Sequence, residues 1–148
     1  MTAVGDLIAS DIELAALKWA KANTAIAAVV HGQVHFEVPG TTPPFPLITL
    51  SLAGSGFPIA SEALIERALI SFSCWAKPFD KATSARVAAV LRTEAFNLYR
   101  APVTVTVPGA AVTLHGADVD NGIWDPDPAG YARHVVDVVF TTTTRAAA

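Results

Sequence analysis

Two histidines, His31 and His35, stand four residues apart, a spacing that on a helix brings two imidazoles together for a metal ion. They fall in Val30–Val38, where apolar and polar residues alternate, and this alternation predicts a strand with one wet face. On a strand the two side chains would lie about 13 Å apart, because each residue advances about 3.3 Å. A tetrahedral site also needs further ligands, and the single cysteine, Cys74, belongs to a separate apolar row. We therefore predict no metal site.

Motifs for nucleophilic or nucleotide chemistry are missing from the sequence. Gly54-Ser55-Gly56 lacks the glycines two places on each side of the serine that a nucleophile elbow requires. Neither a GxxxxGK nor a GxGxxG pattern occurs. A serine, histidine and aspartate could still assemble from distant positions. A small α+β hydrolase therefore stays open as an alternative, with a deep pocket around one of the histidines at positions 31, 35, 115 and 134.

Four aspartates, Asp118, Asp120, Asp125 and Asp127, stand in a segment rich in turn residues. They resemble a calcium loop only superficially, because the glycine falls too early and no glutamate closes the loop. We interpret the segment as a solvated acidic turn. A second hypothesis is that the four carboxylates line a channel and create a negative potential there. Function that is unchanged after all four are replaced by asparagine would contradict this second hypothesis.

The clearest structural signal is a strand that hands over to a helix. Apolar residues alternate along Ala68–Ala76, which predicts a central strand covered on one side. Pro78 cannot extend the strand, and Asp80 can accept hydrogen bonds from the first amides of a helix. Apolar residues then recur at helical spacing as far as Leu98. We expect this helix to lie across the sheet.

The remaining elements follow from similar patterns. A first helix is expected to begin at Asp6 or Ser10 and to end near Ala22. Further strands are expected at Leu47–Leu52, on both sides of Pro108-Gly109 in a hairpin, and at Tyr131–Thr144. Loops are expected near 39–46, 53–62 and 118–130. We therefore predict one domain over residues 1–148, with an α+β fold in which a largely antiparallel sheet of about five or six strands carries two helices on one face.

Composition points to self-association. Apolar residues make up 52% of the chain and charged residues only 16%, against roughly 25% charged in an average soluble domain. Since monomers rarely expose large apolar patches, we expect copies of the chain to cover part of its surface. The net charge of −3 argues against binding to nucleic acid. The longest apolar run, Ala25–Val30, is far shorter than the roughly 20 residues of a membrane span. We therefore expect that the protein does not associate with a membrane. We expect it to be synthesised in the cytoplasm.

Several blocks, taken in order, resemble the tail terminator, or tail completion, proteins of long-tailed (siphovirus-type) bacteriophages. They are the helix ending in Leu17-Lys18-Trp19, PLITL at Pro46–Leu50, ISFSCWAKPFDKATSARVAAVL at Ile70–Leu91, and Asp125-Pro126-Asp127 followed by a strand ending at Phe140-Thr141. The resemblance implies a homo-hexameric ring at the head-proximal end of the tail tube. Such a ring stops tube polymerisation and offers the surface on which the DNA-filled head docks. The implied partners are copies of the chain, the tail tube protein and a head-neck connector, with DNA passing through unbound.

The resemblance implies a virion protein assembled in the host cytoplasm, with no catalysis and no cofactor. It maps Ile70–Leu98 to the core and Gly54–Ser61 to a mobile contact region. Because a ring closes through two different, complementary patches, we expect apolar loop residues at the subunit interface, namely Phe57, Ile59 and Trp124. Alanine or charge at these three positions should abolish rings and leave the fold intact. A head-side neck or head-completion adaptor is the alternative.

Overall fold

A curved, seven-stranded sheet runs through the protein in the order β1-β2-β3-β7-β5-β4, with β6 beside β7. The computed structural model describes residues 8–55 and 64–146. The pair β1–β2 is parallel and the other pairs are antiparallel, which confirms the predicted α+β fold with a largely antiparallel sheet. The bounds are α1 (Ile8–Ala22), α2 (Thr24–Val30), β1 (Val34–His35), β2 (Leu47–Ser55), β3 (Leu64–Pro78), α3 (Lys81–Phe96), the 3-10 helix η2 (Asn97–Tyr99), β4 (Val103–Val107), β5 (Ala110–Val119), β6 (Ile123–Trp124) and β7 (Tyr131–Ala146).

The step from β3 to α3 confirms the strongest sequence signal. β3 lies between β2 and β7 and pairs with both. Asp80 caps α3, because its carboxylate accepts from the amide of Thr83 at 3.2 Å and from the hydroxyl of Thr83 at 2.7 Å. The helix ends at Phe96, earlier than predicted, and η2 continues the chain. The capping signal therefore fixed the start of the helix more sharply than apolar spacing fixed its end.

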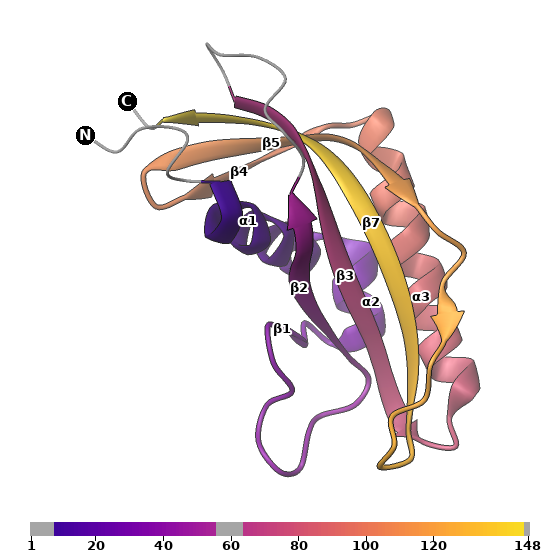
Figure 1. Cartoon of the computed structure of the whole chain (residues 1–148). Coiled ribbons are helices and arrows are strands. Elements are labelled where there is room, and N and C mark those ends of the chain that lie inside the picture. Colours follow the sequence, from indigo (N-terminus) through magenta and orange to yellow (C-terminus); the bar gives the residue numbers. More distant parts are fainter. Residues whose placement is uncertain (1–7, 56–63, 147–148) are drawn as a thin grey trace.

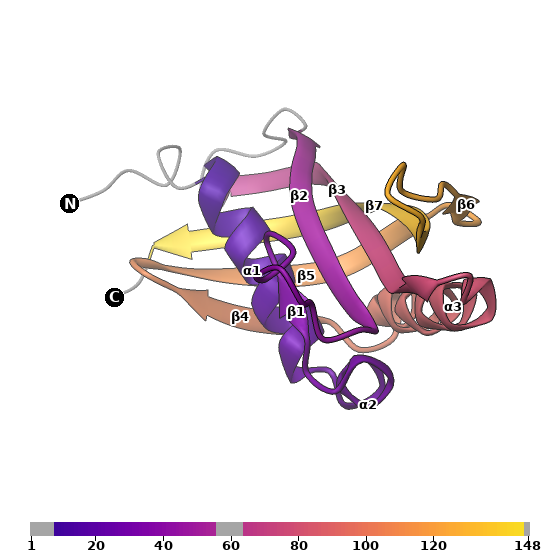
Figure 2. The same cartoon turned by 90° about the horizontal axis from the view of Figure 1, so that it is seen from below.

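The hydrophobic core lies between the helices and one face of the sheet, which we call the core face (Figure 2). The ring of Trp19 from α1 packs edge-on against Phe72 of β3 and Phe140 of β7, with centroids 6.5 and 5.6 Å apart. Both phenylalanines are completely buried. α3 packs against β3, β5 and β7, while α1 reaches from β2 to β4. One helix thus crosses beneath the sheet from edge to edge.

The opposite side of the sheet, which we call the open face, has no helix over it in the described part of the chain. It carries many hydroxyl side chains, including those of Ser71, Ser73, Thr104, Thr113, Thr141 and Thr143. The hydroxyls of Thr104 and Thr113 lie 2.8 Å apart across β4 and β5. The face is therefore polar, with hydroxyl groups among charged residues such as Arg67, Arg133 and Asp137.

The predicted strand at Val30–Val38 is wrong. Residues Thr24–Val30 form α2, in which the Asn23 side chain accepts from the amide of Ile26 and His31 ends the helix at φ 53°. Only Val34–His35 pair as a strand. Of the alternating apolar residues, Val30 is the last residue of α2, Val34 is in β1, and Phe36 and Val38 lie in neither a helix nor a strand. His31 and His35 are therefore not on one strand.

Strand residues extend into two of the three segments that were predicted as loops. β2 continues to Ser55 with a bulge between Leu52 and Gly54, so the strand takes up the beginning of the predicted loop at 53–62. The segment 118–130 contains the end of β5 and the short strand β6. The proline-rich segment 39–46 contains no helix or strand, as predicted. The hairpin of β4 and β5 turns at Pro108-Gly109, with Gly109 at φ 78°, as predicted.

Candidate functional site

Three apolar residues are exposed on this side of the molecule, and we call them the exposed apolar corner: Phe79 in the turn from β3 to α3, and Ile123 and Trp124 of β6. Phe79 is 100% exposed, Ile123 62% and Trp124 38%. Pro78 closes β3 and Asp80 caps α3, and Phe79 between them adopts φ 65°. A bulky residue in the left-handed region is strained by about 1–3 kcal/mol. A fully exposed phenylalanine therefore occupies a backbone position better suited to glycine or asparagine.

Trp124 is held in place on this corner. Its ring stacks against the His134 ring with centroids 5.1 Å apart, and the Lys81 ammonium lies 4.9 Å from the Trp124 ring centroid. β6 also pairs with β7 at these residues, with Trp124 opposite His134. The indole therefore forms a surface feature supported from below, which suits a contact residue. The sequence prediction had named Trp124 but had missed Phe79.

Ser84 and His134 lie below Trp124 and form a serine–histidine pair of the kind found in hydrolases, but the serine is buried. The Ser84 hydroxyl lies 2.7 Å from Nδ1 of His134 and also donates to the carbonyl of Lys81 at 3.1 Å. Either of the two atoms can be the donor of this bond, depending on the tautomer of His134. Burial, and secondly the charge of Lys81, lower the pKa of His134. Ser84 is completely buried, so this pair joins β7 to α3 and offers no nucleophile to a substrate.

The first two of the predicted acidic residues form separate local structures. Asp118 pairs with Arg67 and accepts from the Tyr99 hydroxyl at 2.8 Å. That hydrogen bond, followed by burial, raises the pKa of Tyr99. Asp120 accepts from the amides of Gly122 and Asp137. These two carboxylates therefore stabilise the end of β5 and the turn that follows it.

The other two acidic residues stabilise the hairpin that leads into β7. Asp125 forms an ion pair with Arg133 at 2.8 Å, and the Arg133 guanidinium lies 4.9 Å from the ring centroid of Trp75. The Asp127 carboxylate accepts from the amide of Ala129 at 2.9 Å. Each of the four aspartates thus has its own partner, and a role in lining a channel stays a prediction. Phe57 and Ile59 lie outside the described residues.

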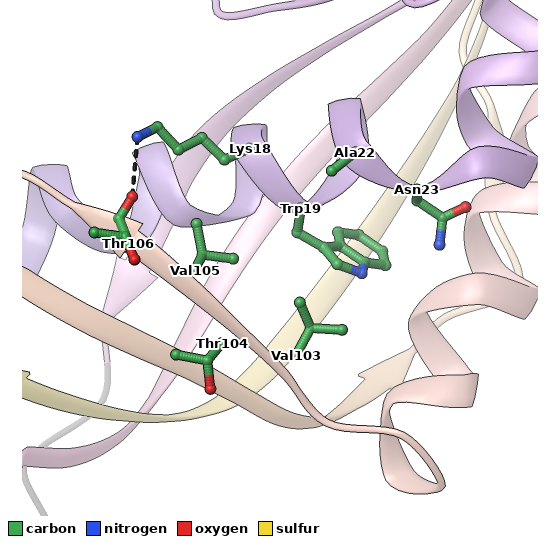
Figure 3. A pocket seen from close by; sticks show the side chains of 8 residues that line it. All are labelled: Lys18, Trp19, Ala22, Asn23, Val103, Thr104, Val105 and Thr106. Carbon is green, nitrogen blue, oxygen red and sulfur yellow. Dashed lines mark hydrogen bonds between the residues drawn. The ribbon is translucent and has the colours of Figure 1, made fainter.

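A groove of about 340 Å³ separates α1 from the edge strand β4 (Figure 3). Trp19 and Ala22 of α1 form its helix side, and Val103 and Val105 form its strand side. At one end, the Lys18 ammonium donates to the Thr106 carbonyl at 2.9 Å. At the other end, Asn23 accepts from Ile26 and donates to Glu94. The groove is therefore an apolar slot beside the edge strand β4, with one cation at its rim.

The edge on the other side of the sheet carries the opposite charge. Glu13, from the same helix, accepts from the backbone amide of Leu52 in β2 at 2.6 Å. α1 thus places one charged side chain on each edge, Glu13 at β2 and Lys18 at β4. Sequence analysis had missed both residues, because charges on an amphipathic helix are usually assigned to solvent. Only the position of α1 across the curved sheet gives them a role.

Metal and membrane sites do not emerge from the described structure. Within residues 8–55 and 64–146, no group of three or more histidine, cysteine, aspartate or glutamate side chains is arranged to hold a metal ion. No helix in those ranges is long and apolar enough to cross a bilayer. Burial raises the pKa of the Cys74 thiol far above its usual range, so this cysteine behaves as a packing residue. A comparison with protein families finds no family that matches the chain, and a comparison with curated proteins finds no match either.

Proposed function

We propose that the protein is a structural subunit that assembles with copies of itself into a ring at the head-proximal end of a phage tail tube. In this role it stops tube polymerisation and presents the surface on which the head docks. The resemblance of its sequence blocks to tail terminator proteins supplies the biological setting. Its low content of charged residues supports the self-association that a ring requires.

The observation that carries the proposal is the exposed apolar corner. Phe79 makes no use of its ring within the chain, being 100% exposed, yet its backbone is held at φ 65°. Strained positions persist where function needs them. Trp124 of β6 packs against His134 and Lys81, the second of which is two residues after Phe79. Aromatic anchors of this kind are typical of the centres of protein interfaces.

The proposed ring is tested by electron microscopy and by tube assembly. The purified protein, alone and added to polymerising tail tube protein, should give closed rings with a central hole and tubes of arrested length. A protein that leaves tube length unchanged and binds the portal end of the head instead would contradict the terminator role and favour a head-side adaptor. A monomer in both conditions would contradict the structural role as a whole.

The corner itself is tested by Phe79→Asn. Asparagine tolerates the left-handed region, so we expect the free energy of unfolding to rise by about 1 kcal/mol while ring formation weakens. Phe96→Gln is the matched control, because it removes a similar ring from another surface. Phe96 is 62% exposed and lies at the far end of α3. Urea unfolding and electron microscopy give the two readouts. Rings that form equally well in both variants would contradict a contact role for Phe79.

A further inference from the structure

The two edges of the sheet are marked by opposite charges from one helix. Glu13 binds the amide of Leu52 at the β2 edge, and Lys18 binds the carbonyl of Thr106 at the β4 edge. Neither side chain forms an ion pair within the described chain. Each charge is therefore held at an edge with a backbone dipole as its partner and with no opposite charge to neutralise it.

β4 is an edge strand with free hydrogen-bonding groups. In an antiparallel pair, residues alternate between those that face the partner strand and those that face away. The Thr106 carbonyl is bound by Lys18, which stands outside the sheet, so Thr106 faces away from β5, and so does Thr104 two residues earlier. The tight turn leads to the same assignment. It places Val107 opposite Ala110, so the backbone groups of Val107 face β5 and those of Thr106 face away. Within residues 8–55 and 64–146, no strand pairs with this edge of β4, so a further strand can add to it.

Among the described residues, only β1 pairs with the outer edge of β2, and it covers only part of it. β1 covers only Ile48 and Thr49 of β2. Beyond them, the Leu52 amide faces outward and is met by the Glu13 carboxylate. The Leu52 side chain is only half-buried and packs at the margin of the core. An incoming strand would therefore find both a backbone partner and an apolar side chain there.

We propose that β4 of one copy pairs with the part of β2 that β1 does not cover in a second copy, so that Lys18 meets the partner's Glu13. This pairing rests on the self-association that the proposed function requires, and it names two surfaces that take part in it besides the exposed apolar corner. It joins two different edges and is therefore a head-to-tail contact, the type that generates rings. It continues the sheet across the subunit boundary and replaces two charge–dipole contacts with an ion pair in a less solvated setting.

The groove beside β4 supplies the apolar part of the same interface. Val103 and Val105 face the core side of β4, and Trp19 lies across the groove from them. A strand added to β4 places its core-side residues over this slot, since side chains alternate between faces. In the proposed pairing the partner's Leu52 takes that position. Apolar burial then provides affinity, and the Lys18–Glu13 charges fix the partner edge and the register.

The test exchanges charges between copies. Glu13→Lys alone places two cations at the junction, and Lys18→Glu alone places two carboxylates there, so each variant should raise the dissociation constant for self-association by at least about tenfold. An equimolar mixture of the two should recover wild-type assembly to within about threefold, because alternating copies restore opposite charges at every junction. The doubly changed chain, E13K/K18E, should recover by itself. Sedimentation velocity at low salt measures all four samples.

Arg86→Glu is the matched control, because it reverses an exposed charge on α3, a helix that packs on neither edge strand. It should assemble as the wild type does. Unfolding midpoints verify that each variant is folded. Single variants that assemble normally, or that fail to recover on mixing, would overturn the edge pairing even if the wild type forms rings. A wild type that stays monomeric alone and with tail tubes would overturn the pairing and the proposed ring together.

Discussion

The two faces of the sheet use the same strands for opposite purposes. On β3, Phe72 and Cys74 point to the core face and are completely buried, while the alternating residues Ser71 and Ser73 point to the open face and are half-exposed. On β7, Phe140 is buried and its neighbour Thr141 is not. One residue step along a strand therefore changes the environment from a close-packed interior to a polar surface.

This difference separates the parts of the molecule that stabilise it from the parts that are free to bind. The core face carries the ring cluster of Trp19, Phe72 and Phe140. The open face carries short hydroxyl side chains that bond to each other, as Thr104 and Thr113 do. We expect substitutions to lower stability strongly on the first face and hardly at all on the second.

The largest effect is expected from Phe72→Ala. Removing a fully buried ring loses its transfer free energy and leaves a cavity beside Trp19 and Phe140, so the free energy of unfolding should fall by about 3–5 kcal/mol. Ser73→Ala, one residue along on the open face, is the matched control and should change it by less than about 0.5 kcal/mol. Urea unfolding followed by circular dichroism measures both. Equal losses at the two positions would break the distinction between the faces.

Much of the fold could be predicted because local signals and tertiary packing agree. The β3–α3 unit combines strict alternation, a stop at Pro78 and a cap at Asp80, and the structure confirms each of them. α2 was missed because its sequence, TAIAAVV, is apolar at nearly every position and shows no helical period. Its caps, Asn23 and His31, are evident only in the structure.

A second, smaller effect is expected at Gly116, in the part of β5 beyond its pairing with β4. A Cβ added at Gly116 would lie 2.5 Å from Cε1 of Tyr99. The Tyr99 ring must then move and lose its hydrogen bond to Asp118. Gly116→Ala should therefore lower the free energy of unfolding by about 1–2 kcal/mol.

Removal of the tyrosine ring tests the cause of that loss. In a Tyr99→Ala background, Gly116→Ala should be close to neutral, because the clash is gone. The coupling between the two substitutions, measured by a double-mutant cycle of unfolding free energies, should be at least about 1 kcal/mol. Additive effects would show that Gly116 is needed for its backbone and not for the close approach of Tyr99.

The assembly surfaces were less predictable than the fold. Trp124 was identified because an aromatic residue in an acidic turn has no evident core role. Phe79 was missed because the sequence gives no sign of its left-handed backbone, and Glu13 and Lys18 were missed because their roles depend on strands that are far from them in sequence. Contacts across sheet edges are set by the curvature of the sheet, which residue patterns do not encode.

A pH dependence is expected at the margin of the core face. Burial, and secondly Lys81, lower the pKa of His134, and burial, and secondly Lys21, lower the pKa of His35. The unfolded chain takes up these protons near pH 6.5, whereas the folded chain does so only at lower pH. The stabilisation is therefore complete above about pH 6.5 and declines as the pH falls toward the folded pKa values.

Substitution of the two histidines tests this dependence. The H35Q/H134Q chain should lose less stability than the wild type between pH 7.5 and pH 5, with each single variant in between. Urea midpoints at half-unit pH steps provide the measurement. A wild-type slope that persists in the double variant would assign the dependence to carboxylates.

The smallest effect is expected on the open face itself, from Thr113→Val. The change removes the hydroxyl contact with Thr104 at 2.8 Å but keeps a β-branched side chain, which suits a strand. Because the partner hydroxyl stays accessible to water, the free energy of unfolding should change by less than about 0.5 kcal/mol. Thr142→Val, one step away on the core face, is the contrasting variant, because Thr142 is completely buried and its hydroxyl has its own interactions. A loss above about 1 kcal/mol for Thr113→Val, equal to that for Thr142→Val, would show that the hydroxyl network stabilises the sheet from both sides.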